Sequence, residues 1–242
     1  MKTKLLSLTL LSFSLFLFSC DIYDTEVVPN GKITTMQATF TDYKAIEASS
    51  AFSVYLVFSD TEESIEIEAN ENLHQYIDVK KENGTLKIGI ENNVQIRGNA
   101  TLKAYIITKQ VEGYSASGAS RFIVENEIHE ENVNIYLSGA STFNGEINSN
   151  RCYANLSGAS SMNILGFADD FELDASGASV IRDYGFEANH LKAELSGASN
   201  AYLTVDNEIE IEASGASSLR YKGDAVITTQ NLSGASSVKQ MN

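Results

Sequence analysis

The sequence predicts an all-β protein, most of which is a right-handed parallel β-helix, a solenoid whose short strands wind in successive coils. Three observations support this fold class. The string Ser-Gly-Ala-Ser (SGAS) occurs seven times at intervals of 18 to 21 residues, apolar and polar residues alternate on both sides of each copy, and the repeats lack helical periodicity. The first serines of the seven copies are Ser117, Ser138, Ser157, Ser176, Ser196, Ser214 and Ser233.

A strand is predicted before each copy of the motif. The residues one, three and five places ahead of its first serine are mostly apolar, and the residues between them are mostly polar. In one coil, Ile209, Ile211 and Ala213 alternate with Glu210 and Glu212. This period of two is typical of a strand with one buried and one solvated face.

A second strand is predicted after each copy. The fifth residue after the first serine is apolar in all seven copies, and the residue before it is mostly polar. These apolar residues are Phe122, Phe143, Met162, Ile181, Ala201, Leu219 and Val238. A glycine often follows within a few residues, so each coil is expected to run strand, SGAS corner, strand and glycine-containing turn.

The motif is interpreted as the corner of each coil. Because the coils of a solenoid stack at about 4.8 Å, each corner residue lies above its equivalent, and only small residues fit such a column. Glycine allows turn angles that a β-carbon obstructs, and serine hydroxyls can donate to one another or to backbone carbonyls. The alternative is that the serines form a binding stripe. The corner glycines are Gly118, Gly139, Gly158, Gly177, Gly197, Gly215 and Gly234.

Other solenoids of similar period fit less well. A calcium-binding β-roll requires an aspartate in every Gly-Gly-x-Gly-x-Asp half-coil, and no copy of the repeat supplies it. Leucine-rich repeats require a Leu-x-x-Leu-x-Leu framework and an asparagine, which are missing. The parallel β-helix remains, and the usual crossover preference makes it right-handed.

Residues 1–19 are predicted to be a lipoprotein signal peptide, because a short positive head precedes an apolar run at residues 5–18 that is too short to span a membrane. The segment Leu17-Phe18-Ser19-Cys20 resembles a bacterial lipobox. Cys20 is therefore expected to be lipidated and to anchor the chain to a membrane of the bacterial cell envelope, the outer membrane. An ordinary signal peptide is the alternative. Cys152 then has no disulfide partner and is expected to be a buried apolar residue.

The rest of the chain is divided into a tether and one domain. Residues 20–39 hold the only proline and no alternation long enough for a buried strand, so they are predicted to be a tether. Residues 40–242 are predicted to form a single β-helix domain, with irregular β-rich coils at 40–112 and the SGAS repeats at 113–242. Residues 70–76 are expected to form a short helical turn, and residues 47–51 a degenerate early copy of the corner.

The chain is strongly acidic, with 17 Lys+Arg against 32 Asp+Glu. Removal of the signal peptide takes away two lysines and no acid, which leaves 15 against 32 and a net charge of −17. Such a surface repels nucleic acid and anionic lipid, so neither is an expected partner and contact with the membrane is expected through the lipid anchor alone.

The order of the segments resembles the head GIN domain family of auto-transporter adhesins, which are exported proteins of Bacteroidetes-type bacteria. The matching stretches are residues 43–46 (YKAI), 52–56 (FSVYL), 65–73 (IEIEANENL) and 83–88 (NGTLKI), followed by the repeats. The resemblance covers about residues 40–240. It implies a right-handed parallel β-helix and a role in adhesion, and it supplies no catalytic residues.

No catalytic motif is found in the sequence, and no cofactor or metal is expected. The three histidines, His74, His129 and His190, are far apart in the sequence and are interpreted as surface residues. The SGAS serines lack a recurring histidine or aspartate. The protein is therefore predicted not to be an enzyme.

Carboxylates on outward positions of adjacent coils are candidates for a cation-binding acidic face. These candidates are Glu172, Asp174, Glu194, Glu210 and Glu212, with Lys192 among them. Such a ladder would suit a polysaccharide-binding or polysaccharide-degrading β-helix protein, which is the alternative function. Strand alternation alone also predicts polar residues there, and the chain has no tryptophan to serve as a platform for sugars.

The predicted function is that of a non-catalytic binding or structural module with an unidentified protein or glycan ligand. Six residues follow the last motif, so the last coil is expected to present an open strand edge. One interpretation is that Lys239 and the polar tail blunt this edge. The alternative hypothesis is that the edge, or a flank of the solenoid, docks a partner or forms a homo-oligomer.

Overall fold

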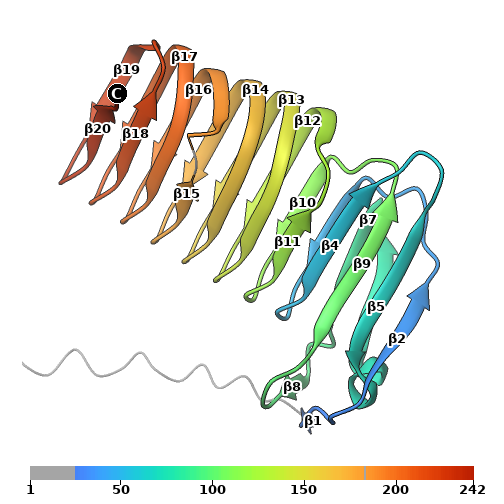
Figure 1. The fold of residues 1–242 in the computed structure, drawn as a ribbon. Coiled ribbons are helices and arrows are strands. Elements are labelled where there is room, and N and C mark those ends of the chain that lie inside the picture. Colours follow the sequence, from blue (N-terminus) through green and yellow to red (C-terminus); the bar gives the residue numbers. More distant parts are fainter. Residues whose placement is uncertain (1–24, 183) are drawn as a thin grey trace, which may run out of the picture.

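The computed structural model describes residues 25–182 and 184–242, in which nearly all of the regular structure is β-strand. Figure 1 shows a stack of parallel coils towards the C-terminus and a less regular group of strands towards the N-terminus. The stack is a β-solenoid of about seven turns, so the predicted fold class is confirmed. No helix in the described ranges is long and apolar enough to cross a membrane.

Each coil contributes one strand to each of two sheets, which meet at the corner. We call the sheet whose strands run into the corner the pre-corner sheet. In order from the N-terminal end it contains β6 (Ile77–Glu82), β7 (Thr85–Ile90), β3 (Ala45–Ala48), β10 (Gly113–Ala116), β12 (Ile128–Leu137), β13 (Thr142–Leu156), β14 (Ser161–Ala175), β16 (Phe186–Leu195), β17 (Asn200–Ala213) and β19 (Val226–Leu232).

We call the sheet whose strands leave the corner the post-corner sheet. The long strands β13, β14 and β17 belong to both sheets, because each runs from one corner to the next. Around them the post-corner sheet contains β2 (Ile33–Ala38), β5 (Ser64–Asn70), β9 (Leu102–Thr108), β4 (Ser53–Phe58), β11 (Arg121–Val124), β15 (Val180–Arg182), β18 (Ser218–Lys222) and β20 (Ser237–Gln240).

Equivalent residues of neighbouring coils pair directly with one another. In the pre-corner sheet Val133 pairs with Cys152, and Cys152 pairs with Phe171. In the post-corner sheet Phe122 pairs with Phe143. All five side chains are buried, so the alternation in the sequence correctly identified the inward face of both strands.

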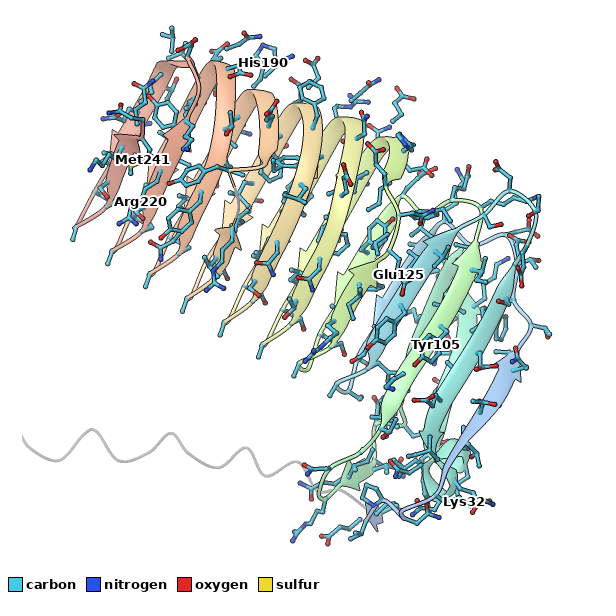
Figure 2. The ribbon with its side chains drawn as sticks, in the orientation of Figure 1. Lys32, Tyr105, Glu125, His190, Arg220 and Met241 are labelled. Atoms are coloured by element: carbon cyan, nitrogen blue, oxygen red, sulfur yellow. The ribbon has the colours of Figure 1, made fainter. Side chains whose placement is uncertain are left out.

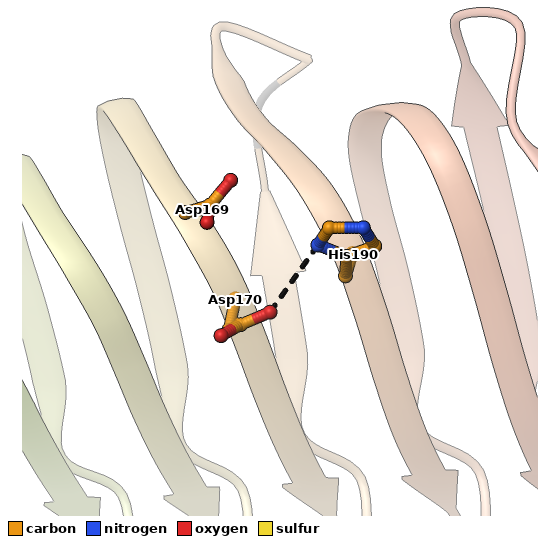
Figure 3. Close-up of side chains that lie close together, drawn as sticks. All are labelled: Asp169, Asp170 and His190. Atoms are coloured by element: carbon orange, nitrogen blue, oxygen red, sulfur yellow. Dashed lines mark ion pairs between the residues drawn. The ribbon is translucent and has the colours of Figure 1, made fainter.

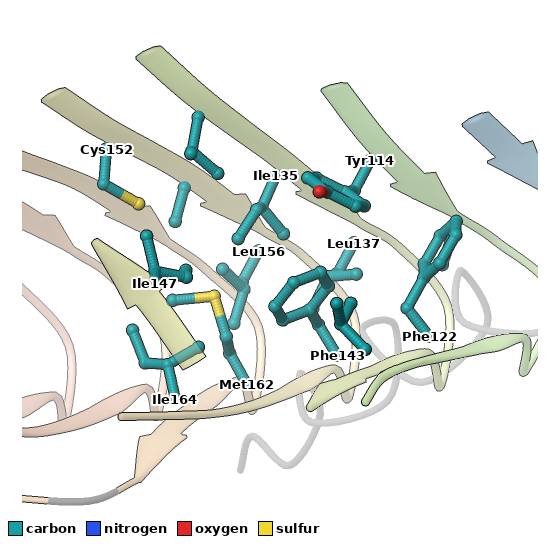
Figure 4. Packing of buried hydrophobic residues seen from close by; sticks show 14 of the residues in the cluster. Tyr114, Phe122, Ile135, Leu137, Phe143, Ile147, Cys152, Leu156, Met162 and Ile164 are labelled. Carbon is teal, nitrogen blue, oxygen red and sulfur yellow. The ribbon is translucent and has the colours of Figure 1, made fainter. Parts of the chain in front are cut away.

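The inward side chains of the two sheets fill one continuous core (Figure 4). At the first complete corner Tyr114 packs edge-on against Phe143, with ring centroids 5.2 Å apart, and its hydroxyl donates to the carbonyl oxygen of Val111 at 2.9 Å. Cys152 is 2% exposed and unpaired, and burial raises the pKa of its thiol to about 12. It behaves as a small apolar core residue, as predicted.

The core opens to solvent at the C-terminal end of the solenoid. Leu232 is 39% exposed, whereas its equivalents Ala213 and Leu195 are 4% and 2% exposed. The outer edges of β19 and β20 pair with no other strand of the described ranges. The open strand edge predicted for the last coil is therefore confirmed.

The N-terminal part departs from the coil pattern. β3 and β4 form a coil with a corner at residues 49–52, but the chain then leaves the stack and adds β5, η1 (Glu71–Tyr76), β6, β7, β8 (Val94–Ile96) and β9 at its outer end. The pairs β2–β5, β5–β9 and β6–β7 are antiparallel. β10 and β11 then pair with the free side of β3 and β4, so the first coil is enclosed between two later parts of the chain.

The corner at residues 49–52 reads Ser-Ser-Ala-Phe in place of SGAS. The N–H of Ser117, in the first complete motif, donates to the carbonyl oxygen of Ala48 at 2.9 Å, which places the two corners at adjacent levels. Ser50 and Ala51 have positive φ angles of 59° and 65°. The degenerate early copy of the corner is confirmed, with Phe52 at the place of the last serine.

The tether predicted at residues 20–39 is wrong over most of its length. β1 (Thr25–Val27) pairs with β8, and β2 pairs with β5 over its whole length, from Ile33–Asn70 to Ala38–Ile65. β2 is an edge strand whose alternate residues are only half-buried, and two of its inward residues, Thr34 and Ala38, are not strongly apolar. The period of two was therefore too weak to reveal the strand. Residues 1–24, with the predicted signal peptide and Cys20, lie outside the described residues.

The short helical turn predicted at residues 70–76 is confirmed as the 3-10 helix η1. It packs beside β2 and buries Leu73. His74 is half-buried in this contact, with its Nε2 2.9 Å from the Thr34 hydroxyl oxygen, so the interpretation of this histidine as a surface residue is wrong. The sequence could not show this because the burial depends on β2, which lies 40 residues away in the chain.

Candidate functional site

The serine at the fourth position of each complete motif points inward. Ser141, Ser160 and Ser179 are fully buried, and their hydroxyls donate to the carbonyl oxygens of the first serines of their own motifs at 2.7, 2.7 and 2.6 Å. Ser199 adds a hydrogen bond to the carbonyl oxygen of Ala175 in the preceding coil at 2.9 Å. These serines close the corner and connect it to its neighbour, and their burial keeps them from contacting a ligand.

The second residue of each SGAS corner is glycine for two physical reasons. Gly177 has a φ of 73°, which L side chains rarely adopt, and a β-carbon there would lie 2.4 Å from the carbonyl oxygen of Gly158. That oxygen accepts the N–H of Ala178 at 2.7 Å, so it is fixed in place. Positive φ angles are found at Gly118, Gly139, Gly158, Gly177, Gly197, Gly215 and Gly234.

The outward side chains of the pre-corner sheet form a candidate binding surface, which we call the ladder face. Each coil places three residues on it, and parallel pairing arranges them in three columns: Asn132, Arg151, Asp170, His190 and Glu208; Asn134, Tyr153, Glu172, Lys192 and Glu210; Tyr136, Asn155, Asp174, Glu194 and Glu212. A groove of about 510 Å³ follows the first two columns. A second groove of about 680 Å³ lies between the third column and the corners.

The candidate carboxylates from the sequence lie in the C-terminal half of the ladder face. Glu172, Lys192 and Glu210 are in register, and the Nζ of Lys192 lies 3.0 Å from an oxygen of Glu172. The hydrogen bond and negative charge of Glu172 raise the pKa of Lys192. The next column holds Asp174, Glu194 and Glu212. Lys192 thus separates Glu172 from Glu210 in their column. None of the candidate carboxylates belongs to the group of side chains whose ligand atoms lie within metal-binding distance of one another.

One group of potential metal ligands occurs in the described part of the chain, at the rim of the first groove (Figure 3). Ligand atoms of Asp169, Asp170 and His190 lie within 4.8 Å of one another, and all three residues are exposed. The Nδ1 of His190 lies 3.2 Å from Asp170, and Asp169 accepts a hydrogen bond from Asn189 at 2.7 Å. Ion pairing and hydrogen bonding account for this cluster without a metal.

Two tyrosines give the N-terminal half of the ladder face an aromatic surface that motif searches miss. Tyr136 is 47% exposed, and its ring centroid lies 5.7 Å from that of Tyr153. The Tyr153 hydroxyl donates to Asp174 at 2.7 Å, which raises the pKa of Tyr153, and accepts from Asn155 at 3.3 Å. Alignment of the repeats on SGAS places both tyrosines at outward positions, so the signal is present in the sequence.

The ladder face is equipped for binding. It offers amide, hydroxyl, carboxylate and aromatic groups on strands that are fixed by parallel pairing and by the core beneath them. Cys152 lies in the floor of the first groove, but burial raises its pKa and keeps the thiol neutral, so it does not act as a nucleophile. His129 is exposed and lies 2.9 Å from Glu127, away from His190 and the groove.

Solved structures from Bacteroidetes species share this architecture. A crystal structure from Bacteroides fragilis, described as a "putative adhesin", is 20% identical, with a TM-score of 0.81 over 89% of this chain and 100% of that chain. One from Parabacteroides distasonis, described as a "putative lipid binding protein", is 18% identical, with a TM-score of 0.74 over 90% of this chain and 100% of that chain. At these identities the likeness shows the fold alone. No match was found among curated proteins.

The sequence itself matches a family model over residues 42–225, which is most of the chain. The description of that family is "Putative auto-transporter adhesin, head GIN domain". The matched range begins just before β3 and ends just before β19, so it leaves out β1, β2 and the last coil of the solenoid. The protein belongs to the head GIN domain family.

Proposed function

We propose that this protein is a non-catalytic adhesin of the bacterial cell envelope, anchored through a lipid on Cys20, whose ladder face contacts the binding partner. The observation that carries the proposal is the ladder face, where three columns of outward side chains and two grooves lie on a rigid two-sheet scaffold. A surface that is already ordered loses little conformational entropy on binding. The family description supports the same class of function.

The proposed anchor would hold the N-terminal end of the domain close to the membrane. Residues 21–24 separate Cys20 from β1, so at about 3.4 Å per residue the link from Cys20 to Thr25 spans at most roughly 17 Å. The corners from residues 49–52 to residues 233–236 are stacked in seven steps of about 4.8 Å, or about 34 Å in all. The later coils and their ladder face would project away from the lipid (Figure 1).

The aromatic pair supports a glycan as the ligand, and glycan binding is the second candidate function. The exposed ring of Tyr136 and the groove beside Tyr153 provide an apolar surface flanked by hydrogen-bonding groups. Sugar-binding clefts combine these same elements. The proposal is therefore a binding surface for a glycan or protein, with Tyr136 and Tyr153 as the central contacts.

Protease treatment of intact cells tests the location. Cells that express the full-length chain are treated with protease before and after lysis, and the chain is followed by immunoblot. The proposal expects digestion in intact cells, and it expects a Cys20→Ala variant to leave the membrane fraction. A chain that is digested only after lysis, or a Cys20→Ala variant that stays membrane-bound, would contradict the anchored surface adhesin.

Substitution of the aromatic pair tests the surface. Adhesion of cells that carry the Tyr136→Ala/Tyr153→Ala variant to host-cell or glycan-coated surfaces is expected to fall at least about tenfold, because the central contacts are removed. The matched control is Tyr55→Ala/Tyr105→Ala, a stacked tyrosine pair 5.1 Å apart on the post-corner sheet. Equal adhesion of both double variants at equal surface levels would exclude the ladder face as the contact.

A further inference from the structure

A cluster of basic and aromatic side chains lies on the opposite side of the solenoid from the ladder face. It occupies the outward positions of the post-corner sheet in the last coils, where Figure 2 labels Arg220. We call it the basic patch, and it consists of Arg182, Tyr184, Tyr202, Arg220, Lys222 and Lys239. The core separates it from the ladder face, so the two surfaces cannot share one contact.

Pairing between coils sets the spacing of the cations. Tyr202 pairs with Arg220, and Arg220 pairs with Lys239. Arg182 is one residue beyond the pair between Ile181 and Ala201, which places it in the coil before Tyr202. The column from Arg182 to Lys239 therefore crosses three steps of about 4.8 Å, or about 14 Å along the solenoid axis.

The aromatic rings and the cations hold one another in place. The guanidinium carbon of Arg220 lies 5.4 Å from the ring centroid of Tyr202, and the Nζ of Lys222 lies 5.1 Å from that of Tyr184. Arg220 also donates to the Tyr202 hydroxyl at 3.2 Å. The two rings are perpendicular, with centroids 6.0 Å apart. Cation–π contacts of this kind order charged side chains before a ligand arrives.

The cations of the patch have no acidic partners in the described part of the chain. Arg182, Arg220, Lys222 and Lys239 form no ion pair there, whereas lysines elsewhere, such as Lys44 and Lys103, do. This is unexpected in a chain with 32 acids and a formal charge of −15. Four cations without an ion pair to any described residue lie on one face and repel one another, and a bound anion would relieve that repulsion.

A hollow beside the rings defines the kind of ligand. Its volume is about 550 Å³, and Arg182, Tyr184, Asn200 and Tyr202 contribute to its lining, in which the described residues include no carboxylate. A flat membrane or a duplex nucleic acid would extend beyond the patch and meet the acidic remainder of the surface. A narrow polyanion that crosses the coils along the axis would contact the cations and the rings alone.

We propose that the basic patch binds an acidic polysaccharide. The guanidinium groups of Arg182 and Arg220 pair with carboxylate or sulfate groups of successive sugars, and Tyr184 and Tyr202 contact the sugar rings within the hollow. Lys222 and Lys239 extend the cationic column along the chain of the ligand. The inference concerns a different face from the ladder face and does not rest on the function proposed above.

Binding to defined polysaccharides tests the patch. The full-length protein, purified in detergent micelles, is titrated with polygalacturonate oligosaccharides and with neutral dextran oligosaccharides of similar length. Saturable binding to the polygalacturonate, weaker at higher NaCl concentration, is expected, and dextran is expected not to bind. Absence of binding to polygalacturonate, or equal binding of dextran, would overturn the proposal.

Variants locate the contact. Arg182→Gln/Arg220→Gln is expected to weaken binding at least about tenfold, and Arg220→Lys, which keeps the charge, to retain most of it. Lys44→Gln/Lys103→Gln removes the same charge from ion-paired sites and is expected to leave binding unchanged. Equal effects of the two double variants would show a net-charge effect and overturn the assignment.

Two further measurements separate this proposal from binding of another polyanion and from binding at the ladder face. Tighter binding of single-stranded DNA, or of phosphatidylglycerol vesicles, than of polygalacturonate would assign the patch to another polyanion and overturn the proposal. The Tyr136→Ala/Tyr153→Ala variant is expected to bind polygalacturonate as the unmodified chain does. Loss of binding in that variant would place the acidic glycan on the ladder face instead.

Discussion

At each SGAS corner, a glycine faces the backbone of the corner in the preceding coil. Gly177→Val forces a β-branched residue into a φ of 73° and against the Gly158 carbonyl oxygen, so we expect it to lower the free energy of unfolding by about 3 kcal/mol or more. Urea denaturation followed by circular dichroism measures the change. Gly31→Val, where a β-carbon meets no atom within 4 Å, is the control. Equal midpoints for the two variants would refute this view of the corner.

The buried serines allow a comparison within one motif position. Ser199→Ala removes a hydroxyl that donates to two carbonyl oxygens, those of Ser196 and Ala175, and should lower the free energy of unfolding by about 1 kcal/mol. Ser120→Ala removes an equally buried hydroxyl that has no hydrogen-bond partner, and it should be neutral or slightly stabilising. Thermal unfolding of both variants decides the matter. A larger loss of stability in Ser120→Ala than in Ser199→Ala would contradict this expectation.

Cys152 links stability to alkaline pH. Burial raises the pKa of its thiol from 9.0 to about 12, so the folded chain keeps a proton that the unfolded chain has already lost. Between about pH 9 and pH 12 the unfolded state binds fewer protons, and stability must therefore fall as pH rises. We expect Cys152→Ala to reduce this alkaline slope, measured from urea midpoints at pH 8 and pH 10. An identical slope in both proteins would show that the thiol is not responsible.

At the scale of elements, substitutions in β2 test whether this segment stabilises the domain as a paired strand or is only a tether. Met36 is half-buried against the core, whereas Ile33 in the same strand points outward and is 44% exposed. Met36→Asp buries an unpaired charge and is expected to cost about 1 to 3 kcal/mol, while Ile33→Asp should have little effect. Thermal unfolding measures both. If Met36→Asp is also without effect, β2 adds nothing to the stability of the domain.

The elements also differ in how far the sequence reveals them. The coils repeat every 18 to 21 residues, so seven copies of the same alternation identify their strands, corners and core. The antiparallel pairs β2–β5 and β6–β7 occur once each and follow no repeat, so nothing in the alternation sets their register. The ladder face was predicted only in its acidic half.

The other contacts on the ladder face depend on which residues of neighbouring coils pair. The ion pair between Asp170 and His190 joins β14 and β16, and the contact between Tyr136 and Tyr153 joins β12 and β13. Such contacts follow from the register between coils of 18 to 21 residues, which a one-residue error would shift to the opposite face. Alignment on SGAS would have supplied that register for the tyrosines.

At the scale of the whole molecule, the solenoid has one covered end and one open end. Antiparallel strands cover the N-terminal end, whereas Leu232 in the last coil is 39% exposed. We expect the amide protons of β19 and β20 to exchange at least about tenfold faster than those of β13 and β14, because the last coil opens without disturbing its neighbours. Hydrogen exchange by NMR measures these rates. Uniform protection along the stack would contradict this expectation.

The enclosed first coil has a consequence for the order in which the protein can fold. β3 pairs with Thr85–Ile88 on one side and with Gly113–Ala116 on the other, about 40 and 68 positions further along the chain. During synthesis from the N-terminus, this coil must wait until both partner strands have been made. Each later coil needs only the 18 to 21 residues that follow its predecessor. We therefore expect the first coil to form slowly and each later coil to add rapidly, because the coil before it already presents a strand edge to pair with.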